Sequence, residues 1–192
     1  IRPVRYLTWD DAAAPLDVSR DFVEPLFREV EVRAIASGIM QKYPHPKLID
    51  EDNLHLITEV GASIRPAREH NGHVIFMIPS GVQSVRIVSN ASRPSDVIGP
   101  FIDDRRYFGV AVGEIIMFEA GQNYTITAHL TDKELEGWNT LEEDGARWTS
   151  GNAVLPLGER HSNSVALMAI QIKETRPYLF NDTILEEISL QA

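Results

Sequence analysis

The sequence contains no cysteine among its 192 residues. This absence excludes disulfides, thiolate metal sites and a cysteine nucleophile, and it leaves the redox compartment of the protein undetermined. Runs of Lys and Arg are also absent, and the 28 acidic residues outnumber the 18 basic ones, for a formal net charge of −10. Nucleic-acid binders usually carry a basic patch and anionic membranes attract basic segments, so neither partner is expected.

Long apolar runs are missing as well. No stretch approaches the ~20 residues that a membrane-spanning helix needs, so membrane insertion is not expected. Apolar residues nevertheless make up 43% of the chain and charged residues 24%, which is ordinary for a globular protein. A domain of this size buries roughly 70% of the surface of its unfolded chain, so its fold does not need a covalent cross-link to be stable.

Signatures of catalysis are not found either. The six histidines form no HxxxH or HExxH pair, and neither a G-x-S-x-G elbow nor a glycine-rich phosphate loop occurs. A zinc site needs three or four converging ligands, which these spacings do not provide. The sequence therefore favours a protein that is not an enzyme.

The N-terminal part predicts one amphipathic helix over residues 19–42. Val23, Leu26, Phe27, Val30 and Ala34 recur at helical spacing on one face, which predicts packing on something larger. The two prolines of "YPHPK" (43–47) cannot continue a helix. We therefore place an N-terminal helical arm at 1–45, through which the chain could form an oligomer, and a second domain at 46–192.

The second domain reads as mainly β. Short apolar or alternating runs are separated by turn residues, as in a β-sandwich or barrel, and we expect a β-sandwich of jelly-roll type. Two pairs of runs predict hairpins, 73–78 with 82–89 and 107–120 with 122–130. The expected strands are 53–60, 73–78, 82–89, 107–120, 122–130, 152–157 and 164–174.

The quartet Asp103-Asp104-Arg105-Arg106 precedes an apolar strand-like run. Alternation places Asp103 with Arg105 and Asp104 with Arg106, so one arginine can pair with a carboxylate bidentately and tie a loop to the end of the domain. We interpret Arg106 as structural. Asp103 and Asp104 remain open as ligand-binding residues, for sugar hydroxyls or for calcium, the one cofactor considered; other metal ligands cannot be named.

Residues 131–151 are predicted as the longest loop, and long loops are often functional. The loop holds Trp138 and Trp148 among many acidic residues. We predict that both rings face outward and bind a sugar or another protein, as Trp does at binding hot spots. The alternative is that both fold inward and close the end of the sandwich, with their indole N–H groups bonded to loop carbonyls.

Residues from about 50 to 157 also resemble an uncharacterised β-rich module of bacterial proteins that carry hedgehog/intein-type (Hint) domains or glycosyltransferases. The Hint catalytic block is not visible, so autocleavage is not carried over. The resemblance implies an accessory, glycan-associated sandwich. It rests on S-x-x-x-x-P (Ser89 to Pro94), D-x-R-x-x-G (Asp104, Arg106, Gly109) and W-T-x-G (Trp148, Thr149, Gly151).

Together these patterns favour a non-catalytic carbohydrate-binding or surface-interaction module, whose partner is a glycan or another protein. One alternative is a polysaccharide hydrolase or lyase that uses a pair of carboxylates, separated by roughly 5–10 Å. The other is a structural domain whose N-terminal helix mediates assembly.

Overall fold

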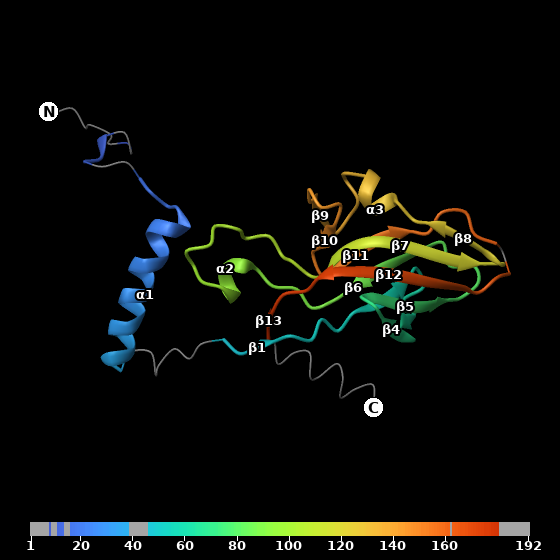
Figure 1. Cartoon of the computed structure of the whole chain (residues 1–192), viewed down its shortest axis with the longest axis horizontal. Coiled ribbons are helices and arrows are strands. Elements are labelled where there is room, and N and C mark those ends of the chain that lie inside the picture. Colours follow the sequence, from blue (N-terminus) through green and yellow to red (C-terminus); the bar gives the residue numbers. More distant parts are fainter. Residues whose placement is uncertain (1–7, 9–10, 14–15, 39–45, 162, 181–192) are drawn as a thin grey trace, which may run out of the picture.

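The computed structural model describes residues 8, 11–13, 16–38, 46–161 and 163–180. The chain is mainly β, with antiparallel pairing throughout (Figure 1). Its helices are α1 (Arg20–Ala36), α2 (Pro94–Val97) and α3 (Ala128–Thr131). Its strands are β1 (Leu48–Ile49), β2 (His55–Thr58), β3 (Ser63–Ile64), β4 (Arg68–His70), β5 (His73–Ile78), β6 (Ser84–Val88), β7 (Ala111–Glu119), β8 (Gln122–Thr125), β9 (Trp138–Leu141), β10 (Arg147–Thr149), β11 (Asn152–Pro156), β12 (Ala166–Glu174) and β13 (Tyr178–Leu179).

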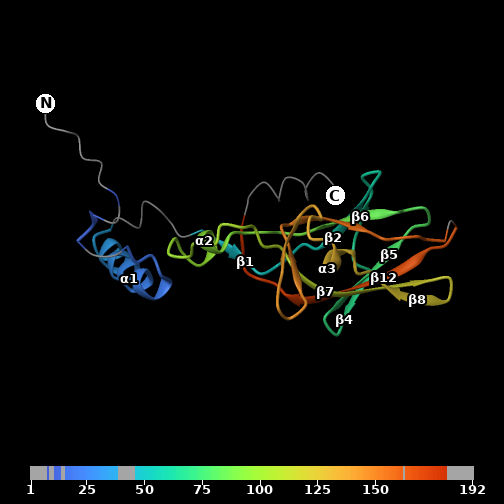
Figure 2. The ribbon, with the colours of Figure 1, turned by 90° about the horizontal axis from the view of Figure 1, so that it is seen from above.

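Two sheets face each other across a shared core. One has the order β4-β5-β12-β7-β10-β9, with β8 also paired to β7, and the other has the order β11-β6-β2-β3. Figure 2 shows the two layers, with β2 and β6 in one and β7, β8 and β12 in the other. The architecture is therefore sandwich-like, as the short alternating runs predicted.

The core forms because alternate residues of each strand point between the sheets. In β5 the buried positions are Val74, Phe76 and Ile78, and β6 contributes Val85 and Ile87 from the facing sheet. Each fully buried aliphatic or aromatic side chain contributes roughly 1.5–3 kcal/mol relative to exposure. These strands were predicted correctly because their period of two is a local property of the sequence.

One predicted hairpin is confirmed and the other is wrong. β7 pairs with β8 across Ala120 and Gly121, which have φ of 49° and 76° and so suit a tight two-residue turn. β5 and β6 do not pair, because β5 lies between β4 and β12 whereas β6 lies between β2 and β11. The connection 79–83 therefore crosses from one sheet to the other.

The predicted loop 131–151 is partly structured, which corrects the sequence interpretation. It contains β9 and β10, which pair with each other, and β10 also pairs with β7. The expected strand 122–130 stops at Thr125, and residues 128–131 turn into α3 instead. Backbone hydrogen bonds from Leu130 and Thr131 to the carbonyl of Thr127 close this helical turn.

Helix α1 lies to one side of the sheets (Figure 1). It ends at Ala36, short of the predicted residue 42, and residues 39–45 lie outside the described residues. None of its residues is buried, so the predicted close packing of the helix is not found, and Phe27 contacts the ring of Phe101 at a centroid distance of 5.5 Å. No helix in the described ranges is long and apolar enough to cross a membrane.

The last described residues return to the end of the sandwich near α2. β13 pairs with β1, and the ring of Tyr178 is buried with its hydroxyl donating to the carbonyl of Gly109 at 2.9 Å. The backbone N–H of Leu179 donates to the hydroxyl of Ser92. These bonds hold residues 174–180 beside the segment that contains the predicted site.

Candidate functional site

A hollow on the outer face of the larger sheet brings together side chains from β7, β10 and β12. Trp148 lies opposite Ala111, and Ala111 lies opposite Glu174, so the three residues form one row across neighbouring strands. Side chains in such a row share one face of the sheet. Because alanine is small, the space above Ala111 stays open between the larger neighbours. This concavity has a volume of about 280 Å³, and we call it the Trp148 concavity; it is lined by Ala111, Glu142, Asp144, Ala146, Trp148, Lys173, Glu174 and Arg176.

The floor of the Trp148 concavity is aromatic, and a cation covers it. Trp148 is 3% exposed and meets Phe108 edge-to-face, with ring centroids 5.4 Å apart. The guanidinium of Arg176 lies 4.6 Å from the Trp148 centroid and 5.0 Å from that of Phe108. Such cation–π contacts are worth ~0.5–1 kcal/mol at exposed sites. Trp148 is thus buried in a small apolar cluster on the outer face of the sheet, separate from the main core.

Asp104 and Arg106 form the bidentate pair that alternation predicted. Arg106 donates from Nε to Oδ1 at 3.0 Å and from Nη2 to Oδ2 at 2.6 Å, and its Nη1 donates to Thr140 of β9. The hydrogen bonds from Arg106 lower the pKa of the Asp104 carboxyl, and the nearby charge of Arg176 acts in the same direction, although burial opposes them. The pair therefore ties loop 101–107 to the β9–β10 hairpin.

The Asp104–Arg106 pair is too exposed for its loss to lower the stability of the fold by a large amount. The Arg106 and Asp104 side chains are 46% and 32% exposed, and exposed ion pairs are worth ~0–1 kcal/mol. The structural interpretation of Arg106 agrees with its contacts, but a cost of several kcal/mol on truncation is not expected. Among the described residues, the ion-pair partner of Asp103 is Arg105, at 3.8 Å, with both side chains largely exposed.

The prediction that both tryptophan rings face outward is wrong. Trp138 belongs to the main core, where its indole N–H donates to the carbonyl of Val154 at 2.7 Å and its ring faces His129. Trp148 is also buried, although it lines the concavity described above. Both tryptophan rings are buried because burial removes their large apolar surface from water once β9 and β10 join the sheet.

Four of the motif residues of the resemblance, Ser89, Gly109, Thr149 and Gly151, pack against one another. A Cβ on Gly109 would lie 2.4 Å from Thr149 Oγ1, 2.5 Å from Ser89 Oγ and 3.0 Å from the backbone N of Gly151. The hydroxyl of Thr149 accepts a hydrogen bond from the backbone N–H of Val110, and Ser89 N–H donates to the carbonyl of Gly151. These residues thus hold the strands around the site together rather than lining it.

A buried arginine that the sequence did not single out supports the β9–β10 hairpin from below. Arg147 is 3% exposed and donates to the backbone carbonyls of His129, Asp132, Lys133 and Asn139. Burial lowers the pKa of the His129 ring, and its Nδ1 has no partner among the described residues. Arg147 therefore has a structural role, because its guanidinium donates to backbone carbonyls.

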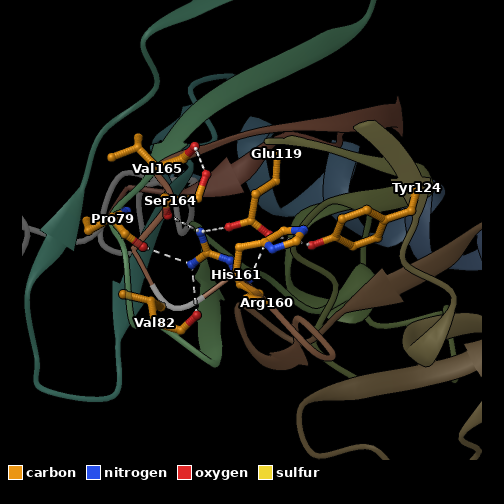
Figure 3. A network of polar contacts seen from close by, with 8 residues as sticks. All are labelled: Pro79, Val82, Glu119, Tyr124, Arg160, His161, Ser164 and Val165. Carbon is orange, nitrogen blue, oxygen red and sulfur yellow. Dashed lines mark hydrogen bonds and ion pairs between the residues drawn. The ribbon is translucent and has the colours of Figure 1, made fainter. Parts of the chain in front are cut away.

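A second polar cluster closes the opposite end of the sandwich (Figure 3). Arg160 and Glu119 form an ion pair at 2.8 Å with both side chains fully buried. Arg160 also donates to the carbonyls of Pro79, Val82 and Ser164. Burial disfavours the charged carboxylate, but hydrogen bonds from Arg160 and from His161 N–H outweigh it and lower the pKa of Glu119. The cluster clamps the connection 79–83 that crosses between the sheets.

Metal binding is not indicated by the described side chains. Within residues 8, 11–13, 16–38, 46–161 and 163–180, no three His, Asp or Glu side chains are placed to hold an ion. Calcium at Asp103 and Asp104 stays a prediction.

The structure therefore unites part of the predicted site. Asp104, Arg106 and Trp148 meet around Phe108, whereas Asp103 and Trp138 lie apart from them. Sequence reasoning missed Phe108, Lys173, Glu174 and Arg176. Lys173 and Glu174 end the run "SVALMAIQIKE" and Arg176 follows it, and nothing local to that run says that its end pairs beside Ala111.

Comparisons of the chain with models of protein families, with curated proteins and with solved structures found no match.

Proposed function

We propose that this chain is a non-catalytic carbohydrate-binding or surface-interaction module whose ligand, a glycan or a surface of another protein, rests in the Trp148 concavity. The observation that carries the proposal is the row Trp148–Ala111–Glu174, which leaves a hollow between an aromatic ring and a carboxylate. Aromatic rings contact the apolar faces of sugars. Carboxylates accept hydrogen bonds from hydroxyls, and the ammonium of Lys173 and guanidinium of Arg176 donate them.

Arg176 is the residue that a ligand meets first. Its side chain is 37% exposed, its Nε donates to Glu174 at 3.3 Å, and its guanidinium covers Trp148. A long, partly exposed arginine can swing aside at small energetic cost, because a single exposed ion pair is worth ~0–1 kcal/mol. Ligand binding then exchanges the Arg176 contact with the ring for a sugar face, while the guanidinium donates to ligand oxygens.

We also propose that the sandwich is of jelly-roll type and that the residues before 46 form a helical arm. A jelly roll winds eight strands as two Greek keys, so that strands distant in sequence become neighbours. The placement of β12 between β5 and β7 and of β11 beside β6 supports this description. The resemblance to a glycan-associated bacterial module points in the same direction.

A glycan array probed with the full chain tests the proposal, followed by calorimetric titration of a glycan that it retains. Arg176→Gln should weaken binding ~10- to 100-fold, because hydrogen bonds from a charged group contribute ~1.5–3 kcal/mol. Arg86→Gln is the matched control. Arg86 is 38% exposed and is also paired with a carboxylate, but it lies on the smaller sheet. Retention of no glycan, or equal loss in both variants, would reject glycan binding at this concavity.

An enzymatic alternative is favoured by the three carboxylates of the Trp148 concavity, Glu142, Asp144 and Glu174. A hydrolase would need two of them as acid and base or nucleophile. Polysaccharide incubated with the full chain should then release new reducing ends, and Glu142→Gln or Asp144→Gln should abolish release while the polysaccharide is still retained. Loss of retention without any turnover supports the binding module.

Assembly through α1 is the remaining alternative, and its exposed apolar side chains favour it. Phe22, Leu26 and Val30 follow one another at helical spacing and are each more than half exposed. Light scattering of the full chain and of residues 46–192 distinguishes the two cases. An oligomer that becomes a monomer on truncation supports assembly, whereas two monomers reject it.

A further inference from the structure

A second concavity adjoins the first and carries an excess of positive charge. It has a volume of about 390 Å³ and contains the side chains of Arg20, Arg93, Arg176 and Glu174. Glu174 and Arg176 line both concavities, so the two are adjacent at these side chains. We call the second one the Arg93 concavity. A lining that includes three arginines and one glutamate is unexpected in a chain with a net charge of −10.

Among the three arginines that line this concavity, Arg93 has no acceptor among the described residues. The described part of the chain gives its guanidinium no hydrogen bond or ion pair, and its Nε is buried without a partner. Its one contact of note is with the ring of Tyr107, 4.5 Å from the centroid. By contrast, the Nε of Arg20 donates to Glu24 and the Nε of Arg176 donates to Glu174.

An unpaired guanidinium of this kind points to an anionic ligand. Leaving a buried donor unsatisfied is destabilising, and more so when the group is charged. A guanidinium presents its donors as a planar fork that matches a carboxylate bidentately. An anion placed against Arg93 would therefore satisfy donors that the protein leaves free.

The lining of the Arg93 concavity restricts the class of ligand that fits it. Pro94, Val97 and Pro177 line it with aliphatic surface, so the ligand has an apolar flank beside its charge. Glu174 repels a dianion more strongly than a monoanion, and it accepts hydrogen bonds from hydroxyl groups. A ring that carries one carboxylate, several hydroxyls and an apolar C–H face fits all three features.

We propose that the Arg93 concavity is a subsite for the carboxylate of an acidic sugar, held by Arg93 and Arg176, while a neighbouring sugar occupies the Trp148 concavity. The ligand class is then an oligosaccharide that contains uronic acid residues. This inference rests on the proposed function, because the two concavities share Glu174 and Arg176.

Calorimetric titration of the full chain with a galacturonate tetramer and with its methyl ester tests the inference. The ester removes the charge and leaves the rings intact. We expect the acid to bind at least 10-fold more tightly than the ester, and Arg93→Gln to bring this ratio close to one. Arg93→Lys, which keeps the charge without the fork, should give an intermediate ratio. Arg86→Gln is the control and should leave the ratio unchanged.

The outcomes separate the two proposals. Binding of the ester without any gain from the acid overturns the acidic subsite alone. Binding of neither tetramer, together with an empty glycan array, overturns the proposed function as well. Inorganic phosphate that displaces the acid tetramer at equal concentration would reassign the subsite to phosphate and overturn the sugar assignment. Melting temperatures of the variants within a few degrees of the parent show that altered binding does not come from unfolding.

Discussion

Arg106 and Arg160 each pair with a carboxylate, yet their surroundings differ. Arg106 and Asp104 are 46% and 32% exposed, whereas the Arg160 and Glu119 side chains are both fully buried. Water screens the charges of the Arg106–Asp104 pair, so losing this pair lowers the free energy of unfolding only slightly. Removing one partner of a buried pair leaves an uncompensated charge, which costs roughly 3–5 kcal/mol.

Arg106→Ala should therefore lower the free energy of unfolding by about 1 kcal/mol or less, and Arg160→Ala by roughly 3–5 kcal/mol. Urea denaturation of both variants against the parent chain measures the difference. A variant at Arg160 that does not fold would agree with the larger cost. Equal losses at the two positions would mean that burial does not govern these pairs.

The buried pair also predicts sensitivity to acid. The pKa of Glu119 in the folded chain is lowered from its ordinary value of 4.5. The stability that its ionised form contributes is therefore complete above about pH 4.5 and is lost as the pH falls through the lowered pKa. Melting temperatures measured from pH 7 to pH 3 should fall steeply for the parent and less steeply for Glu119→Gln, which starts lower at pH 7.

Glu136→Gln is the control for that titration, because Glu136 pairs with Arg86 but is 69% exposed. Its melting curve should follow the parent at every pH. A parallel decline of the parent and of Glu119→Gln would show that other carboxylates account for the acid sensitivity.

At the scale of the elements, β10 and β11 approach the start of β7 so closely that a glycine is needed there. Gly109 does not have a positive φ, so the requirement is space and not conformation. The surrounding hydroxyls of Ser89 and Thr149 hydrogen-bond locally, to the Asn90 carbonyl and the Val110 N–H, and cannot both move away freely.

Gly109→Ala should destabilise the chain by about 1–3 kcal/mol, as overpacking of a close contact does. Ser89→Ala removes one of the two obstructing hydroxyls. In the double variant the loss should be smaller than the sum of the single losses, because the two sites touch. Additive losses measured by thermal unfolding would show that the backbone shifts instead of the side chains colliding.

At the scale of the whole molecule, the sandwich holds the stability and α1 adds little to it. No residue of α1 is buried, and its aromatic and cation–π contacts with the body are those of Phe27, Arg20 and Arg28 with the ring of Phe101. Most helical stability in proteins comes from packing, which this helix lacks. The main core, in contrast, draws buried side chains from both sheets.

The fragment 46–192 should therefore fold on its own with a β-type far-ultraviolet circular dichroism spectrum. Its melting temperature should lie within a few degrees of that of the full chain. Loss of cooperative unfolding in the fragment would mean that the helix is an integral part of the domain. A helical spectrum from the fragment would contradict the mainly β fold itself.

Several features of this protein follow from its sequence alone. The strands β5, β7, β11 and β12 were recognisable because a period of two and a preference for β-branched residues are local properties. The β7–β8 hairpin followed from its glycine-containing turn, and the Asp104–Arg106 pair from alternation over two residues.

Only the tertiary structure decided the partners of those strands and the contents of the site. β5 and β6 entered different sheets, Trp138 joined the main core and Trp148 became buried on the outer face of the larger sheet, because pairing depends on which distant edges are free. Arg176 reached Trp148 for the same reason, since β12 lies beside β7 and β7 beside β10. Contacts between residues this far apart in the chain leave no periodic trace in either segment, so they emerge only when the sheets close over the core.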